Sequence, residues 1–247
     1  MNKENKLELY KMMLLIRLFE EALEEMFSRG LLHGTMHLSI GQEATATGAC
    51  LALEREDLIT STHRGHGHCL AKGADPYKMF AELLGREDGY CRGRGGSMHI
   101  ADLSNGNLGA NGIVAGSLTI SVGAALSLKM QKLNNIVLCF FGDGAVNEGS
   151  FHEALNLASL WDLPVLFVCE NNQYGMSMAS ENAVAGGSIA QRAESYGINS
   201  VSIDGNDVEE VFNTVSDFKN KIKSYGKPMF IESCLLYTSP SPRDYPG

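Results

Sequence analysis

The chain has 247 residues, of which 44% are hydrophobic and 20% charged, and its formal net charge is -9. This length and composition are typical of a globular protein with a substantial core, and the acidic balance argues against nucleic acid or an anionic membrane as a partner. No stretch reaches the roughly 18 uninterrupted apolar residues that a membrane span requires. The six cysteines form no CxxC pair, which favours reduced thiols in a cytosol-like compartment.

The chain begins with an amphipathic pattern. Residues 6–29 place apolar side chains at helical spacing, and Gly30 follows as a stop signal, so we predict a helix that packs on a core. The acidic residues Glu8, Glu20 and Glu21 in this segment are not typical of a signal peptide or a mitochondrial presequence. We therefore expect a cytoplasmic location.

Histidines occur in two nearby segments. The first, GTMHLSIGQEA, contains His37, and a single histidine is by itself more typical of a structural role than of catalysis. The second, LITSTHRGHGH, is a short strand that enters a basic loop with His63, Arg64, His66 and His68. Its His-Gly-His alternation matches no common zinc spacing, and an arginine would repel a metal. The loop favours an anion such as a diphosphate, and for His68 we expect a structural role.

Two glycine-containing turns follow. Residues 92–100 (RGRGGSMHI) could cradle a phosphate or form a mobile surface loop, and both interpretations stay open. Residues 111–114 (NGIV) precede a small-residue helix that we predict over residues 118–130. In this turn Gly112 allows a close approach of the backbone to a ligand, and Val114 offers a flat apolar wall.

The central stretch predicts a strand–helix–strand unit. The apolar run of residues 136–141 is typical of a buried strand and ends at the GDG of residues 142–144. Helical periodicity over residues 150–162 and a second apolar run over residues 165–169 follow, and the latter ends at ENN. A right-handed crossover brings both loops to the carboxyl edge of a parallel sheet. We therefore predict that Asp143 and Asn172 lie side by side.

This pair of loops suits a hard divalent cation. Magnesium binds about six oxygens and takes only one or two of them from side chains. Asp143, Asn172 and a backbone carbonyl near Tyr174 would provide the protein ligands, and a diphosphate would provide others. The alternative is that the aspartate and the asparagines only form turns after the strands.

Further strands are predicted over residues 199–204 and 228–232, with an amphipathic helix over residues 208–224 between them. The fold class is therefore α/β, a parallel sheet with helices on both faces, in one domain of residues 1–233. Residues 234–247 contain three prolines and no period. We expect them to be a non-native tail on a C-terminally truncated chain.

The strings GDGAVNEGSFHEALNLASLW and ENNQYGMS resemble the alpha subunits of the thiamine diphosphate-dependent decarboxylase component of 2-oxo acid dehydrogenase complexes, and the resemblance covers residues 7–233. It implies a thiamine diphosphate-binding fold with thiamine diphosphate and Mg²⁺ as cofactors. The magnesium ligands it implies are Asp143, the Asn172 side chain and the Tyr174 carbonyl.

The same resemblance implies roles for other residues. The diphosphate would lie at Gly144 and Ala145 and contact His63 and Arg64, and the aminopyrimidine would be held by backbone groups of Gly112 and Val114. The candidate catalytic residues are His37, on the substrate side, and His66, near the mouth of the active site. The GGSMH segment, with His99, would lie by the substrate channel.

The predicted function is that of the alpha subunit of a pyruvate dehydrogenase (acetyl-transferring), an oxidoreductase that is active only with a beta subunit. By resemblance, it forms a heterotetramer of two alpha and two beta subunits and passes the two-carbon unit to a lipoyl domain of the dihydrolipoamide acyltransferase. An acetoin dehydrogenase alpha subunit is the alternative, because STHRGHGHCLAKG and SMHIADL are acetoin-like whereas ENNQYGMS is pyruvate-like.

Two other functional classes are alternatives to this one. A catalytically inactive, truncated interaction subunit is a further alternative, because the second histidine-containing loop of the family is missing here. By resemblance, Ser117-Leu118-Thr119 stands where relatives usually carry a proline, and this departure bears on substrate preference more than on cofactor binding. A nicotinamide-binding dehydrogenase is not supported, because neither GRGGSM nor GDGAVNEG is a GxGxxG after a first strand.

Overall fold

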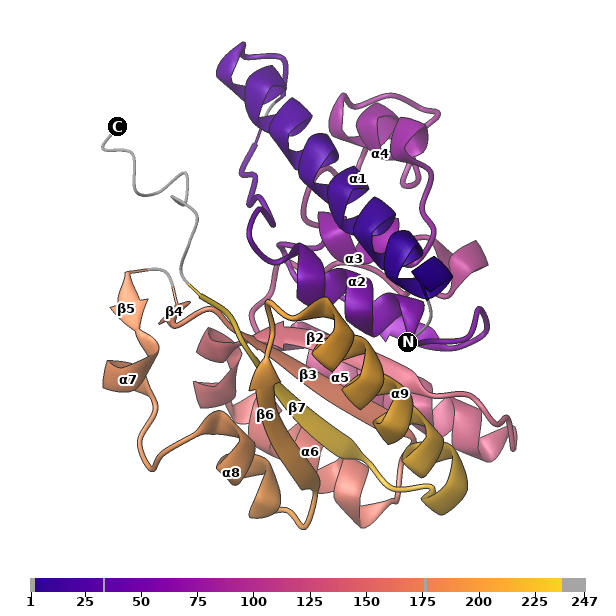
Figure 1. Cartoon of the computed structure of the whole chain (residues 1–247), viewed down its shortest axis with the longest axis vertical. Coiled ribbons are helices and arrows are strands. Elements are labelled where there is room, and N and C mark those ends of the chain that lie inside the picture. The colour runs from indigo at the N-terminus through magenta and orange to yellow at the C-terminus, as the bar shows by residue number, and fades with distance from the viewer. Residues whose placement is uncertain (1–2, 33, 176, 237–247) are drawn as a thin grey trace.

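The fold is built on a five-stranded parallel sheet. The structure, a computed structural model, describes residues 3–32, 34–175 and 177–236 of the chain. The strand order is β1-β2-β3-β7-β6, and all neighbours are parallel (Figure 1). The strands are β1 (Leu58–Thr60), β2 (Val137–Gly142), β3 (Val165–Asn171), β6 (Asn199–Asp204) and β7 (Met229–Cys234). The predicted parallel sheet is therefore confirmed.

Helices cover both faces of the sheet, as predicted. The core on one face of the sheet includes residues of α1 (Lys3–Ser28), α2 (Glu43–Leu51), α3 (His66–Ala71), α4 (Pro76–Leu83) and α9 (Val208–Tyr225). The core on the other face includes residues of α5 (Gly116–Met130), α6 (Gly149–Leu160) and α8 (Ile189–Glu194). The first four helices form the upper part of the molecule in Figure 1.

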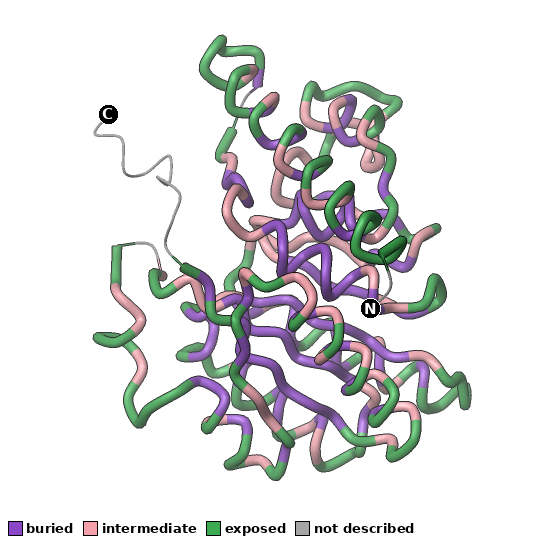
Figure 2. The backbone as a smooth tube through the Cα atoms, in the orientation of Figure 1, coloured by how far each residue is buried: buried purple, intermediate pink, exposed green. Residues whose placement is uncertain are grey.

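The alternation of side chains along the strands explains the two apolar cores. In β2, Leu138 and Phe140 belong to the core beneath α1, α2 and α9, whereas Cys139 and Phe141 belong to the core with α5 and α6. A parallel strand covered on both faces buries every side chain. Figure 2 accordingly shows the central strands as continuous buried segments.

Short elements occur where the sequence predicted loops. The residues after GDG form a 3-10 helix, η2 (Asp143–Asn147), and a second one, η1, spans Leu103–Asn105. The segment after the turn at the end of β3 contains a short hairpin, in which β5 (Met178–Ala179) pairs with β4 (Tyr174–Gly175), followed by α7 (Ser180–Ala183). These elements have only a few residues each, so no hydrophobic period could reveal them.

Near the C-terminus, the described chain continues past the predicted boundary at residue 233. Cys234 is the last residue of β7, and the amide of the buried Leu235 donates to the Asn171 carbonyl at 2.9 Å. The rest of the predicted tail, from residue 237 on, lies outside the described residues. Among the helices described, none is both long and apolar enough to cross a bilayer.

Candidate functional site

The crossover from β2 through α6 to β3 brings two loops together at the carboxyl edge of the sheet. Gly142 of β2 is in register with Glu170 of β3. A Cβ atom on Gly144 would lie 3.6 Å from the Gly175 Cα. The loop after β2 and the turn after β3 are therefore in contact, as the crossover geometry predicts.

Asp143 begins η2 and is only 3% exposed. Burial raises the pKa of its carboxyl, although hydrogen bonds from its own amide, the Ser180 hydroxyl and the Gly144 amide oppose the shift. The nearby Glu232 carboxylate raises the pKa of Asp143 further. A buried carboxylate in this state gains from a bound cation, which stabilises its charged form.

The turn after β3 is formed by the two asparagines. Asn171 Oδ1 accepts from the Gln173 amide at 3.1 Å, and Asn172 Oδ1 accepts from the Tyr174 amide at 3.3 Å. Gln173 has a φ of 70°, in the left-handed region, so the backbone reverses sharply at this point. The asparagines therefore do form the turn. An amide oxygen has two lone pairs, so this geometry also leaves Asn172 able to bind a cation.

Both loops line one cavity of about 390 Å³. Its other lining residues include those of the segment around His37, the loop after β1 and the turn before α5. The predicted site residues that line the cavity are His37, His63, Arg64, Gly112, Val114, Asp143, Gly144, Ala145, Asn172 and Tyr174. The fold thus brings together predicted site residues from five segments that are distant in sequence, among them candidate cation ligands and candidate anion donors.

The basic side of the cavity is ordered by contacts of its own. The rings of His37 and His63 meet edge to face, with centroids 4.7 Å apart and planes at 79°. The Arg64 guanidinium donates to the Leu38 carbonyl. These contacts join the segment around His37 to the loop after β1, so the two histidine segments form one wall.

His66 is not among the residues that line this cavity. The residue is completely buried, with Nδ1 3.1 Å from Glu20 Oε1 and Nε2 2.9 Å from the Ser97 hydroxyl. Glu20 is also buried and accepts from the Ser39 hydroxyl at 2.7 Å. Because α3 begins at His66, its side chain turns towards α1 and not towards the cavity.

The glycine-rich loop of residues 91–96 already holds an anion from its own chain. The Glu82 carboxylate, 1% exposed, accepts from the amides of Cys91 (2.7 Å), Gly93 (2.9 Å), Gly95 (2.7 Å) and Gly96 (3.1 Å). These amides are therefore not available to a phosphate. Met98, which follows this loop, lines the cavity, and its Cε would lie 3.9 Å from a Cβ on Gly112.

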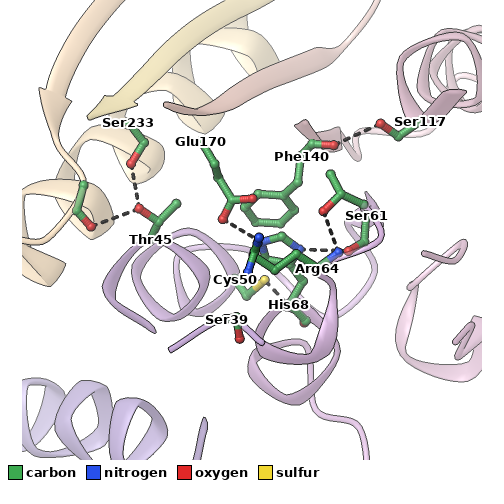
Figure 3. Close-up of polar contacts among 12 residues, drawn as sticks. Ser39, Thr45, Cys50, Ser61, Arg64, His68, Ser117, Phe140, Glu170 and Ser233 are labelled. Carbon is green, nitrogen blue, oxygen red and sulfur yellow. Dashed lines mark hydrogen bonds and ion pairs between the residues drawn. The ribbon is translucent and has the colours of Figure 1, made fainter. Parts of the chain in front are cut away.

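Sequence reasoning missed Glu170, which lines the cavity and is 5% exposed. Its Oε1 lies 3.0 Å from His68 Nε2 (Figure 3). The signal was a charged residue at the end of an otherwise apolar run, next to the two asparagines. Among the described side chains there is no group of three or more His, Cys, Asp or Glu that could hold a metal.

The sequence is similar to one protein family and to several known proteins of that family. A family model described as dehydrogenase E1 component matches residues 10–237. The chain is 49% identical to the alpha subunit of acetoin:2,6-dichlorophenolindophenol oxidoreductase from Bacillus subtilis. The aligned region has 237 residues and covers 96% of this chain and 71% of the relative. Identity to the protein of the same name from Cupriavidus necator is 44%, with the same coverage. Identity to the pyruvate dehydrogenase E1 component alpha subunit of Zymomonas mobilis is 40%, over 94% of this chain and 66% of the relative.

Proposed function

The chain belongs to the dehydrogenase E1 component family, as an alpha subunit of its thiamine diphosphate-dependent oxidoreductases, and we propose that the cavity at the carboxyl edge of the sheet is where it binds the diphosphate together with Mg²⁺. One observation carries this proposal: a buried carboxylate and an asparagine from the β2–α6–β3 unit share a single cavity with His63 and Arg64. An anion bridged to a cation needs both kinds of group within reach.

The residues present fit such a ligand. Asp143 is a buried acid whose pKa is raised by desolvation, so a cation would offset the cost of its charge. A Cβ atom built on Gly142 meets nothing within 4 Å, and the nearest atom to one on Gly144 is the Gly175 Cα. The backbone of this turn is therefore open to a phosphate.

The chain's own residues divide the work of binding. Asp143, the Asn172 side chain and the Tyr174 carbonyl would hold Mg²⁺, and Gly144 and Ala145 would lie at the diphosphate. His63 and Arg64 would neutralise the remaining phosphate charge, and Gly112 and Val114 would hold the aminopyrimidine through their backbone. When bound, thiamine diphosphate supplies an electron sink for decarboxylation of a 2-oxo acid or cleavage of a related ketone.

His37 is the candidate catalytic residue of this chain. It lines the cavity and is 9% exposed. Its edge-to-face contact with His63 orients the ring. An oriented imidazole at the wall of the cavity suits proton transfer to or from a bound substrate. His66 is instead bound on both ring nitrogens, to Glu20 and Ser97, so its role in this function is structural.

For the substrate we propose acetoin or pyruvate, and identity favours acetoin. The two acetoin oxidoreductase alpha subunits are 49% and 44% identical, against 36–40% for the pyruvate dehydrogenase alpha subunits. Pyruvate remains the second candidate because ENNQYGMS, the turn after β3, resembles the pyruvate enzymes.

The proposed partners are a beta subunit, in a heterotetramer of two alpha and two beta chains, and a lipoyl domain that accepts the two-carbon unit. By resemblance, a glutamate of the beta subunit activates the cofactor. The buried carboxylates of Glu20, Glu82, Glu170 and Glu232 in this chain are all engaged in hydrogen bonds to its own groups. We therefore expect no turnover by this chain alone.

Calorimetric titration with thiamine diphosphate, with and without Mg²⁺, tests the proposal. We expect thiamine diphosphate to bind and its binding to depend on Mg²⁺. If thiamine diphosphate binds neither with nor without Mg²⁺, the site is refuted. Assays of the chain with its genomic partner beta subunit, on acetoin and on pyruvate in parallel, then identify the substrate. Turnover by the isolated chain would contradict the requirement for a beta subunit.

A further inference from the structure

A buried chain of hydrogen bonds connects two walls of the cavity. The Ser61 hydroxyl lies 2.8 Å from His68 Nδ1, and His68 Nε2 lies 3.0 Å from Glu170 Oε1 (Figure 3). The three side chains come from the loop after β1, from α3 and from the end of β3. They are 0%, 2% and 5% exposed, respectively.

The chemistry of these groups fixes the orientation of the imidazole. An ionised carboxylate only accepts, so His68 Nε2 donates to Glu170, and in the neutral ring Nδ1 accepts from the Ser61 hydroxyl. The ring also stacks on Phe140 of β2, with centroids 3.7 Å apart and planes within 8°. Its rotation and its height above the sheet are therefore both determined.

Both ends of this series of hydrogen bonds, Ser61 and Glu170, adjoin or line the cavity. Ser61 directly precedes the cavity-lining segment of Thr62, His63 and Arg64. Glu170 lines the cavity itself and is separated by one residue from Asn172. The ring of His68 thus spans from the segment that carries the anion donors to the strand end that carries a cation ligand.

We propose that His68 is a positioning residue, which holds the loop of residues 61–65 at a fixed distance from the strand end at Asn172. The inference rests on the proposed function, because a diphosphate bridged to a metal must meet both walls at once. Pre-ordering the two walls removes an entropic cost that binding would otherwise have to meet. Errors of about 1 Å in such a spacing are known to be costly in active sites.

The competing explanation is that His68 only fills space in the core. Replacement by phenylalanine separates the two, because His68→Phe keeps an aromatic ring against Phe140 but removes both hydrogen bonds. His68→Gln keeps an amide that can donate to Glu170. Thr45→Val is a matched control, because it also removes buried hydrogen bonds. The Thr45 hydroxyl contacts the Ser233 hydroxyl at 2.6 Å and donates to the Gly205 carbonyl at 2.9 Å. These bonds connect α2 with the β6–β7 end of the sheet.

Calorimetry of the full chain with thiamine diphosphate at saturating Mg²⁺ is the first measurement. We expect His68→Phe to weaken binding by about 10-fold or more, and His68→Gln by less than about 3-fold. Thr45→Val should lower the melting temperature but leave the affinity within about 2-fold of the wild type. If the wild type binds and His68→Phe binds equally well, the inference is overturned.

Hydrogen exchange of the ligand-free chain is the second measurement, and it does not depend on the cofactor. We expect His68→Phe to raise amide exchange in residues 61–65 and 170–174, and Thr45→Val to leave both segments unchanged. Unchanged exchange in His68→Phe also overturns the inference.

A wild type that binds no thiamine diphosphate refutes the proposed function, while the exchange data still decide on the connection between the walls. Should His68→Phe not fold, Ser61→Ala, which removes one hydrogen bond only, takes its place in both measurements.

Discussion

Gly144 and Gly175 face each other where the loop after β2 meets the turn after β3. A Cβ on Gly144 would lie 3.6 Å from the Gly175 Cα, and one on Gly175 would lie 3.4 Å from the Gly144 Cα. Two glycines at this point allow the loops to touch without side chains between them. The contact explains how two turns that are separated by a whole helix come to form one site.

Gly144→Ala should weaken cofactor binding without a large change in stability. The added Cβ meets the Gly175 Cα at an ordinary contact distance, so we expect the stability of the ligand-free chain to change little. The same methyl group lies where a diphosphate would approach the backbone, so affinity for thiamine diphosphate with Mg²⁺ should fall by about 10-fold or more. Thermal unfolding and calorimetry measure the two effects.

Gly123→Ala provides the control. A Cβ there would meet nothing within 4 Å on an exposed position of α5, and alanine is favoured over glycine in a helix by about 1 kcal/mol. We expect a more stable chain with unchanged affinity. Equal affinity of Gly144→Ala and the wild type would contradict a diphosphate at this turn.

Asp143→Asn should stabilise the ligand-free chain while it removes metal-dependent binding. Because burial raises the folded-state pKa of Asp143 above its ordinary value of 3.8, ionisation of this group opposes folding. The cost is absent below that ordinary value and develops as pH rises through the folded-state pKa. The stability gain of the variant should therefore appear towards neutral pH and vanish in acid, as denaturant titrations from about pH 4 to 8 would show.

The same carboxyl predicts how metal affinity depends on pH. A magnesium ligand must be deprotonated, so the apparent affinity for Mg²⁺ should fall as pH is lowered through the raised pKa of Asp143. In Asp143→Asn, binding with Mg²⁺ should be at least about 100-fold weaker. A variant that retains the metal dependence of the wild type would exclude Asp143 as a ligand.

Glu20→Ala tests the structural role of His66. The variant leaves His66 Nδ1 and the Ser39 hydroxyl without their buried acceptor, which should cost about 3 kcal/mol and lower the melting temperature by about 6–12 °C. Glu21→Ala on the same helix is the control, because Glu21 is exposed and its ion pair with Arg17 is 4.0 Å long. A loss of less than about 0.5 kcal/mol is expected there, and equal effects of the two changes would be inconsistent with the buried network.

Glu82→Gln should loosen the glycine-rich loop. Its carboxylate accepts four backbone amides, and an amide side chain turns a donor towards some of them, at a cost of about 2–3 kcal/mol. We expect faster amide exchange and proteolysis within residues 91–96. The exposed Glu87 offers the comparison, since Glu87→Gln should change neither. Unaltered exchange in Glu82→Gln would show that the loop does not depend on this anion.

Thiol labelling checks the burial of the cysteines. All six are free, and burial raises the pKa of Cys50 and of Cys69 to about 12. A thiolate-directed reagent near pH 8 should therefore label the exposed Cys234 and the half-buried Cys91 first, and leave the buried thiols unreacted until denaturant is added. Mass spectrometry of digested samples identifies the labelled sites, and early labelling of Cys50 or Cys69 would be inconsistent with the packing described.

The sequence by itself determined the sheet, the crossover and the place of Asp143 and Asn172 at one edge of the sheet, where both line the same cavity. Apolar runs of strand length and a helical period between them identify β2, α6 and β3, and the handedness of parallel connections then places both loops at one edge. Local patterns were sufficient because the result depends on backbone geometry, which is nearly the same in every crossover of this kind.

Only the tertiary structure decided which side chains face the cavity and which are bound inside the protein. His63 and His66 are three positions apart, yet one lines the cavity and the other is buried against Glu20. The Glu82 carboxylate accepts hydrogen bonds from backbone amides that the sequence suggested for a phosphate. Glu170 contacts His68, which lies in a distant segment of the sequence. Loop side chains follow no period, and contacts between distant segments arise only when helices pack on the sheet, so no local pattern carries this information.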